Sequence, residues 1–128
     1  MNIALIADDA KKTLMQNLCI AYKNVLSSHE LYATGSTGRL IEEFSGLRVN
    51  KFLFGHLGGE NQIGTMIKNN QIDCIIYLRD PARSEQSGAS LFILCEEASI
   101  PIATNLASAE ILIKALERGD MDWREWYK

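Results

Sequence analysis

Residues 31–44 read LYATGSTGRLIEEF, and this stretch decides the fold. It opens on the three residues of a short strand and continues into a turn at 34–38 that carries two glycines and three hydroxyl side chains. Glycine permits tight turning and close backbone approach, and the segment that follows, with Leu40, Ile41 and Phe44, is expected to be a helix. We therefore predict a strand, a glycine-rich turn and a helix in succession.

The same strand–helix unit recurs along the chain. Apolar runs predict strands at 2–7, 31–33, 73–78 and 100–103, and the alternation of polar and apolar residues at 48–54 predicts a half-buried strand. A helix should follow each strand: the first runs to about Ser27, and the last has Ile111 on its inner face and stops at Gly119. Such alternation favours a parallel sheet with helices on both faces. The predicted fold class is α/β, a three-layer αβα sandwich around a mostly parallel five-stranded sheet, in a single domain over residues 1–128.

The composition excludes several classes of protein. Of the 128 residues, 47% are hydrophobic and 23% charged, which excludes disorder and coiled coil. A net charge of -3 argues against a dedicated nucleic-acid binder, and the apolar runs are too short for a membrane span. The three cysteines lack CxxC spacing and are expected to be buried and reduced. With no signal-peptide pattern at the start, we expect a cytoplasmic protein.

Polar loops should meet at one edge of the sheet, because ligands of such folds bind beyond the carboxyl ends of the strands. Lys12 follows the first strand, and Thr34, Ser36 and Thr37 follow the second. A lysine, three hydroxyls and the free N–H groups of a helix can hold a phosphate. The alternative is an ordinary glycine-rich turn beside a solvated lysine.

Carboxylates and a histidine belong to the same edge. Glu60 opens a helix, where it is either a general base or a residue favoured by the helix dipole. Asp80 precedes a proline and is either a fixed carboxylate at the edge or part of an Asx turn. His56 is in an edge loop, whereas His29 lies outside the edge and is expected at the surface. The fitting chemistry is proton abstraction beside a carbonyl, or binding of a phosphorylated metabolite alone.

The chain resembles the methylglyoxal synthase family over essentially its whole length. The matching stretches are IALIA at 3–7, LYATGSTG at 31–38, LGG at 57–59, DP at 80–81, IPIATN at 100–105 and ERGD at 117–120. The resemblance implies a single α/β domain that converts dihydroxyacetone phosphate into methylglyoxal and inorganic phosphate, with no metal or cofactor. It also implies a homohexamer that binds neither nucleic acid nor membrane, and the aromatic tail with Trp123, Trp126 and Tyr127 supports an oligomer.

The resemblance also implies roles for single residues. Lys12 and the hydroxyl residues Thr34, Ser36 and Thr37 correspond to the positions that hold the substrate phosphate, with Ser36 where threonine is more usual. The backbone of Gly55 completes that phosphate site. Asp80 matches a family aspartate and is counted as catalytic.

Three positions and one loop depart from the family pattern. Glu60 replaces the catalytic aspartate, Phe54 replaces a serine that contacts phosphate, and Asp8 replaces the histidine after the first strand. We count Asp8 among the substrate-binding residues. The loop 83–88 is shorter and lacks the family's histidine and aspartate.

Two hypotheses therefore stay open. In the first, the chain is a divergent methylglyoxal synthase in which Glu60 is the base and His56 takes the missing imidazole role, with Glu85 as another candidate for the missing groups. In the second, it is a non-catalytic regulatory paralogue that binds a phosphorylated metabolite.

Overall fold

A computed structural model of the chain describes residues 1–52, 59–83 and 89–127. The strands are β1 Asn2–Ala7, β2 Glu30–Thr34, β3 Val49–Phe52, β4 Cys74–Leu78 and β5 Ile102–Ala103. The α-helices are α1 Lys12–Ala21, α2 Lys23–Leu26, α3 Gly35–Ser45, α4 Gly59–Lys68, α5 Ala89–Ala98 and α6 Leu106–Arg118. Two 3-10 segments complete the fold, η1 Asp9–Lys11 and η3 Asp122–Tyr127.

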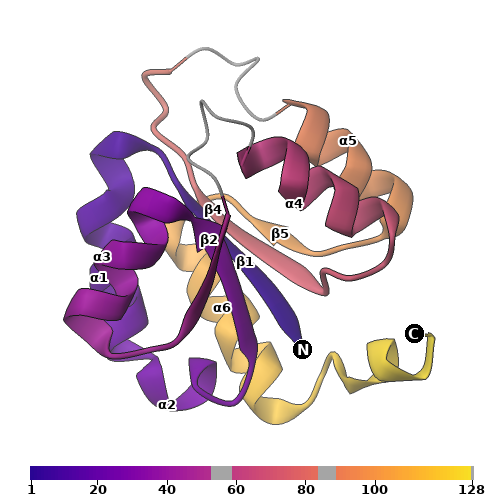
Figure 1. Cartoon of the computed structure of the whole chain (residues 1–128). Helices are drawn as coiled ribbons and strands as arrows, with labels where there is room; N and C mark the ends of the chain where they lie inside the picture. The colour runs from indigo at the N-terminus through magenta and orange to yellow at the C-terminus, as the bar shows by residue number, and fades with distance from the viewer. Residues whose placement is uncertain (53–58, 84–88, 128) are drawn as a thin grey trace.

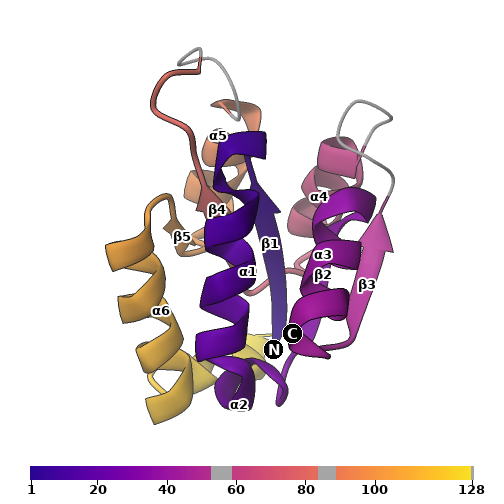
Figure 2. The ribbon, with the colours of Figure 1, turned by 90° about the vertical axis from the view of Figure 1, so that its left-hand side faces the viewer.

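The five strands form one sheet in the order β3-β2-β1-β4-β5. Every pairing is parallel, from Ile3 opposite Leu31 to Ile76 opposite Ala103. β1 is central, and its carboxyl end lies where the chain order reverses direction across the sheet (Figure 2). The predicted α/β fold with a parallel five-stranded sheet is confirmed.

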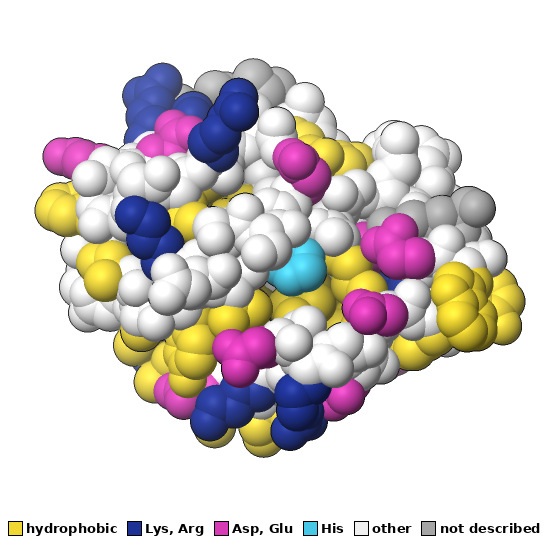
Figure 3. Space-filling view, turned by 90° about the horizontal axis from the view of Figure 1, so that it is seen from below, with side chains coloured by type: hydrophobic (Ala, Val, Ile, Leu, Met, Phe, Trp, Pro, Cys, Tyr) yellow, Lys and Arg dark blue, Asp and Glu magenta, His cyan; other side chains and the backbone are white. Residues whose placement is uncertain are grey.

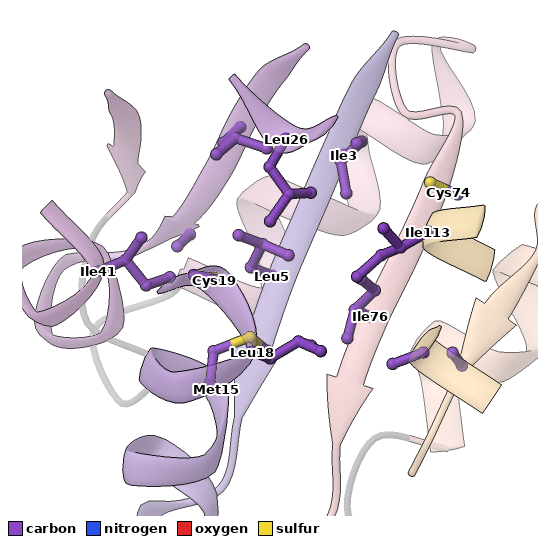
Figure 4. Packing of buried hydrophobic residues seen from close by; sticks show 14 of the residues in the cluster. Ile3, Leu5, Met15, Leu18, Cys19, Leu26, Ile41, Cys74, Ile76 and Ile113 are labelled. Atoms are coloured by element: carbon purple, nitrogen blue, oxygen red, sulfur yellow. The ribbon is translucent and has the colours of Figure 1, made fainter. Parts of the chain in front are cut away.

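Helices cover both faces of the sheet, as Figures 1 and 2 show. On one face Ile3 and Leu5 of β1 pack with Met15 of α1 and Ile113 of α6 (Figure 4). On the other face the alternate residues of β1, Ala4 and Ile6, pack with α4 and α5. Because successive strand side chains point to opposite faces, a strand covered on both sides is apolar throughout. This explains why β1 and β4 form apolar runs in the sequence.

Two helices differ from their predictions. The first predicted helix is divided into η1, α1 and α2, with Tyr22 between α1 and α2 at φ -110° and ψ 26°. The prediction that Ile111 faces inward is wrong. Ile111 is 69% exposed, while Ala109 and Ile113 are fully buried. The predicted stop of α6 at Gly119 is confirmed, with a left-handed φ of 78°.

The three cysteines are free and buried, as predicted. Burial raises the pKa of Cys19 and of Cys74 to about 12 and that of Cys95 to about 11. These thiols therefore stay protonated near neutral pH and are poor nucleophiles. Within the described residues, no helix is long and apolar enough to cross a membrane.

The end of the molecule where the strands begin is closed by the tail. Arg124 of η3 donates from Nε to Asp73 Oδ1 at 3.2 Å, and both side chains are buried. Asp73 also accepts from the backbone N of Asn2 at 2.7 Å, which ties the tail to the start of β1. Figure 3 views this end and shows hydrophobic side chains among charges of both signs.

Candidate active site

Four of the five loops expected at the carboxyl edge of the sheet have described residues there. The ends of β1, β2, β4 and β5 lie at one edge, with the segments 8–12, 34–38, 80–83 and 104–105 following them (Figure 2). The loop after β3, which holds Gly55 and His56, lies outside the described residues, as does Glu85. Glu60 is in the first turn of α4, and its side chain is also outside the described part.

Lys12 and Ser36 meet as the phosphate hypothesis requires. Lys12 Nζ donates to Ser36 Oγ at 2.9 Å and also pairs with Asp9 Oδ1 at 3.1 Å. Ser36 is in the first turn of α3, whose leading N–H groups have no partner inside the helix. That turn contains no acidic residue, and its cap Thr34 makes no side-chain cap bond. A cation, a hydroxyl and a helix N-terminus therefore converge on one place that suits an anion.

The three hydroxyl residues differ in their access to solvent. Thr34 is 8% exposed and Thr37 only 1%, whereas Ser36 is half-buried. The second glycine of the turn has a packing role. A Cβ on Gly38 would lie 2.6 Å from Cγ of Lys51, so only glycine lets α3 approach β3 this closely. The turn predicted at 34–38 is thus mostly the opening of α3 itself.

Asp8 is a buried carboxylate that joins the end of β1 to the segment after β4. Its Oδ1 accepts from the Tyr77 hydroxyl at 3.3 Å and from Arg83 NH1 at 2.7 Å. Its Oδ2 accepts from the backbone N of Asp80 at 2.7 Å. Asp8 makes no side-chain cap bond to the following turn. The carboxylate instead fixes where Asp80 and Arg83 lie at the edge.

Asp80 adopts the Asx turn that the sequence offered as one alternative. Its Oδ1 accepts from the backbone N of Ala82 at 2.9 Å, and its carbonyl accepts from the backbone N of Arg83 at 3.1 Å. These bonds hold the half-buried carboxylate at the edge of the sheet.

His29 lies away from this edge, as predicted. It is half-buried rather than a surface residue, and its Nδ1 lies 3.1 Å from the amino group of Met1. Burial, followed by that positive charge, lowers the pKa of His29. Among the described residues, no group of three or more His, Cys, Asp or Glu side chains is arranged to hold a metal ion.

A cavity of about 380 Å³ lies on the far side of Asp8 from the Lys12–Ser36 pair. It is lined by Lys11, Arg79, Asp80, Pro81, Arg83, Thr104 and Asn105. The sequence predicts Asp80 and residues 104–105 at the edge, but it does not predict that Arg83 pairs with Asp8. Nothing local signals that pairing, because the carboxylate lies 75 residues earlier in the chain.

Comparisons with known proteins agree with this architecture. Residues 15–104 match the family model described as MGS-like domain. The methylglyoxal synthase of Caldicellulosiruptor saccharolyticus is 59% identical over 128 residues, covering 98% of this chain and 91% of that protein. The methylglyoxal synthase of Thermoanaerobacterium thermosaccharolyticum is 50% identical over 131 residues, covering 100% of this chain and 98% of that protein.

A solved structure shares the fold as well. The crystal structure of methylglyoxal synthase from Elizabethkingia anophelis superposes with a TM-score of 0.82 at 36% identity, covering 88% of this chain and 76% of that one. The parallel sheet, the loops gathered at its carboxyl edge and these relatives agree with one another: the chain belongs to the methylglyoxal synthase family.

Proposed function

We propose that this chain converts dihydroxyacetone phosphate into methylglyoxal and inorganic phosphate. The observation that carries the proposal is the Lys12–Ser36 contact of 2.9 Å at the start of α3, which supports a phosphate site at this place. Relatives named methylglyoxal synthase are 50% to 59% identical over nearly the whole chain, which supports the same reaction.

The reaction needs a base and a leaving-group site. A base removes a proton from the hydroxymethyl carbon beside the carbonyl, and the electron pair passes to the carbonyl oxygen to form an enediolate. The enediolate then expels phosphate from the other carbon, so that the C–O bond breaks and its electron pair leaves on the phosphate. The enol aldehyde that remains takes up a proton on that same carbon and becomes methylglyoxal. A cation and helix N–H groups at that phosphate lower the barrier, because negative charge develops there.

We assign the base to Glu60 and the phosphate site to Lys12 and the hydroxyls of Thr34, Ser36 and Thr37, together with the backbone of Gly55. Glu60 opens α4 at the same edge of the sheet. A bound phosphate adds negative charge nearby, which should raise the pKa of the Glu60 carboxyl toward that of a useful base.

Around the carbonyl we assign Asp80 and His56. Asp80 is already held at the edge by its turn. Asp8 serves as a positioning residue in this proposal rather than as a direct phosphate ligand, because two negative groups repel and its oxygens already bind Tyr77, Asp80 and Arg83.

Turnover of dihydroxyacetone phosphate in a colorimetric methylglyoxal assay tests the proposal. Glu60→Gln keeps the shape and removes the base, so kcat should fall at least about 100-fold while phosphate binding persists. Lys12→Met should weaken phosphate binding instead. Lys114→Met changes an exposed lysine of α6 and is the matched control, which should alter neither.

Two outcomes would contradict the proposal or its assignment. Unchanged turnover in Glu60→Gln would remove Glu60 as the base. No turnover by the parent protein, with phosphate still bound, would instead assign the chain to the regulatory, non-catalytic alternative. Glu60→Asp restores the side chain that the family has at this position. If the extra methylene of Glu60 limits the rate, this change should raise activity; if the other substitutions limit the rate, it should not.

We also propose that the chain is one cytoplasmic domain that assembles as a homohexamer. The support for assembly is the exposed aromatic tail, where Trp126 is 84% and Tyr127 is 74% exposed. Aromatic surface of this size is favourably buried against another copy. Light scattering at micromolar concentration should give six times the mass of one chain, and a monomer mass would count against assembly.

A further inference from the structure

The cavity beside Asp8 gathers positive charge at the edge of the sheet. Among the described residues that line it, Lys11, Arg79 and Arg83 are cations and Asp80 is a carboxylate. We propose that this cavity is a second anion-binding subsite, separate from the Lys12–Ser36 phosphate site, and that it takes a phosphate or carboxylate group of a small molecule. The proposal does not depend on the reaction assigned above.

Two consecutive lysines are divided between the two sites. Lys12 contacts Ser36 and Asp9 on the side of β2. Lys11 ends η1 and lines the cavity on the side of β4 and β5. The backbone N of Lys11 donates to the carbonyl of Asp8 at 2.8 Å, which fixes the turn between the two side chains. The sites are therefore adjacent but are served by different cations.

Arg83 is held in place before any ligand arrives. Its NH1 donates to Asp8 Oδ1 at 2.7 Å, and Asp8 is itself buried and bonded to Tyr77 and Asp80. The Arg83 side chain is nevertheless 52% exposed, so it reaches the cavity and solvent. A guanidinium oriented in advance loses little conformational freedom on binding, and its planar N–H donors match carboxylate and phosphate oxygens.

Arg79 and the start of α6 form the other wall. The Arg79 guanidinium carbon lies 5.0 Å from the centroid of the Phe92 ring, which orients the cation by its attraction to the ring face. The backbone N of Arg79 donates to the carbonyl of Thr104 at 3.4 Å. Asn105 caps α6 by accepting from the backbone N of Ser108 at 3.0 Å, so the helix begins at this wall. Thr104 and Asn105 add polar groups beside the two arginines.

A larger cavity has a different charge balance. It has a volume of about 640 Å³ and lies at the opposite end of the sheet, where Lys23 and Arg48 are balanced by Glu30 and Glu42. Of the described residues that line the edge cavity, three are cations and one, Asp80, is a carboxylate, with Asp8 as a further carboxylate behind Arg83. The described lining of this cavity is therefore net positive, although the chain as a whole carries a net charge of -3. Such a hollow raises the local concentration of anions.

Titration calorimetry of the full chain with inorganic phosphate tests the proposal, with succinate as a second probe for a carboxylate ligand. We expect two phosphate equivalents per chain. The double variant Lys12→Met with Ser36→Ala should keep one of them. Lys11→Met and Arg83→Gln should each weaken that remaining site about tenfold, because each removes one charged partner. If succinate binds the double variant more tightly than phosphate does, the natural ligand is a carboxylate.

The results separate this subsite from the phosphate site of the proposed reaction. Two equivalents in the parent chain, one of them sensitive only to Lys11 and Arg83, support the subsite. One equivalent that disappears in the double variant overturns it and leaves the reaction proposal intact. The proposal is also overturned if the double variant keeps a phosphate site that neither Lys11→Met nor Arg83→Gln weakens. Circular dichroism checks that each variant is folded, and Thr13→Val, an exposed change one residue after Lys12, is the control.

Discussion

Two arginine–carboxylate pairs hold opposite ends of the sheet, and they differ in access to water. At the end where the strands begin, Arg124 and Asp73 are 6% and 0% exposed. At the carboxyl edge, Asp8 is 3% exposed while Arg83 is 52% exposed. The same two functional groups therefore form a closed pair in one place and an open pair in the other.

The surroundings explain what each pair does. Arg124 also donates to the carbonyls of Ser99 and Ile72 and to Asn70, so its charge is used entirely within the fold. Asn70 and Ser99 follow α4 and α5, and a cation near helix carboxyl ends is stabilising. Arg83, in contrast, turns an exposed guanidinium toward a cavity. The closed pair stabilises the fold, and the open pair lines the cavity that we propose as an anion subsite.

Breaking the closed pair should have the largest effect on stability. Arg124→Ala leaves Asp73 buried without its guanidinium, and removal of one partner from a buried ion pair typically costs about 3–5 kcal/mol. Urea unfolding should therefore give a free energy of unfolding lower by about that amount. Arg118→Ala is the control, because the Arg118–Asp120 pair is exposed on both sides and should be worth less than about 1 kcal/mol. Equal losses in the two variants would contradict the comparison.

Removing the charge of the buried carboxylate at the open end should have an intermediate effect. Asp8→Asn keeps the shape but weakens the bonds from Tyr77, Asp80 and Arg83, which are charge-assisted in the parent. We expect a loss of about 1–3 kcal/mol in the free energy of unfolding. Because Arg83 can move into solvent, the loss should be smaller than for Arg124→Ala. A larger loss would show that the open pair carries the stability of the fold.

The contrast between the two ends also marks what the sequence could and could not predict. Strands such as 2–7 and 73–78 could be predicted because both of their faces are buried and their sequences are apolar throughout. The edge loops could be predicted because each one follows a strand. The Asp73–Arg124 pair could not be predicted, because the two residues are 51 positions apart and no local pattern links them. Ile111 fits a helical stripe but lies on its exposed side, since periodicity gives the spacing of a face and not its direction.

The candidate site was predicted in the same uneven way. Lys12 and Ser36 were expected together because each follows a strand, and the carboxyl ends of parallel strands meet at one edge of the sheet. The Asp8–Arg83 pair was missed, because it depends on how the segment after β4 turns back to β1. The glycine at 38 was assigned to the turn, and only the distance to Lys51 reveals its packing role.

At the end of the sheet that holds the closed pair, His29 should make stability depend on pH. We expect this effect to be smaller than that of either substitution above. Burial and the Met1 amino group lower the pKa of His29 below 6.5, so the unfolded chain binds a proton more readily than the folded chain. The contribution of neutral His29 is complete above pH 6.5 and is lost as the pH falls through the lower, folded value. His29→Gln should therefore flatten the decline of unfolding free energy between pH 7 and pH 5.

Glu42 provides an internal check on that measurement. Its hydrogen bond from Lys51 lowers the pKa of Glu42 below 4.5, so its contribution persists above pH 4.5 and is lost only in stronger acid. Of His29 and Glu42, only His29 should therefore contribute to the decline of the unfolding free energy near pH 6. An unchanged decline in His29→Gln would contradict that assignment.

Breaking the open pair from the arginine side should have the smallest effect on stability. Arg83→Gln removes the guanidinium, yet Asp8 keeps the Tyr77 hydroxyl and the backbone N of Asp80 as donors. Water can also reach the place that the half-exposed arginine leaves, so the carboxylate is not stranded. Exposed and half-exposed pairs are worth about 0–1 kcal/mol, and urea unfolding should show a loss within that range. A loss as large as that of Arg124→Ala would make Arg83 a structural residue. The expected small loss, measured beside a weakened phosphate titration, would separate ligand binding from folding at the same side chain.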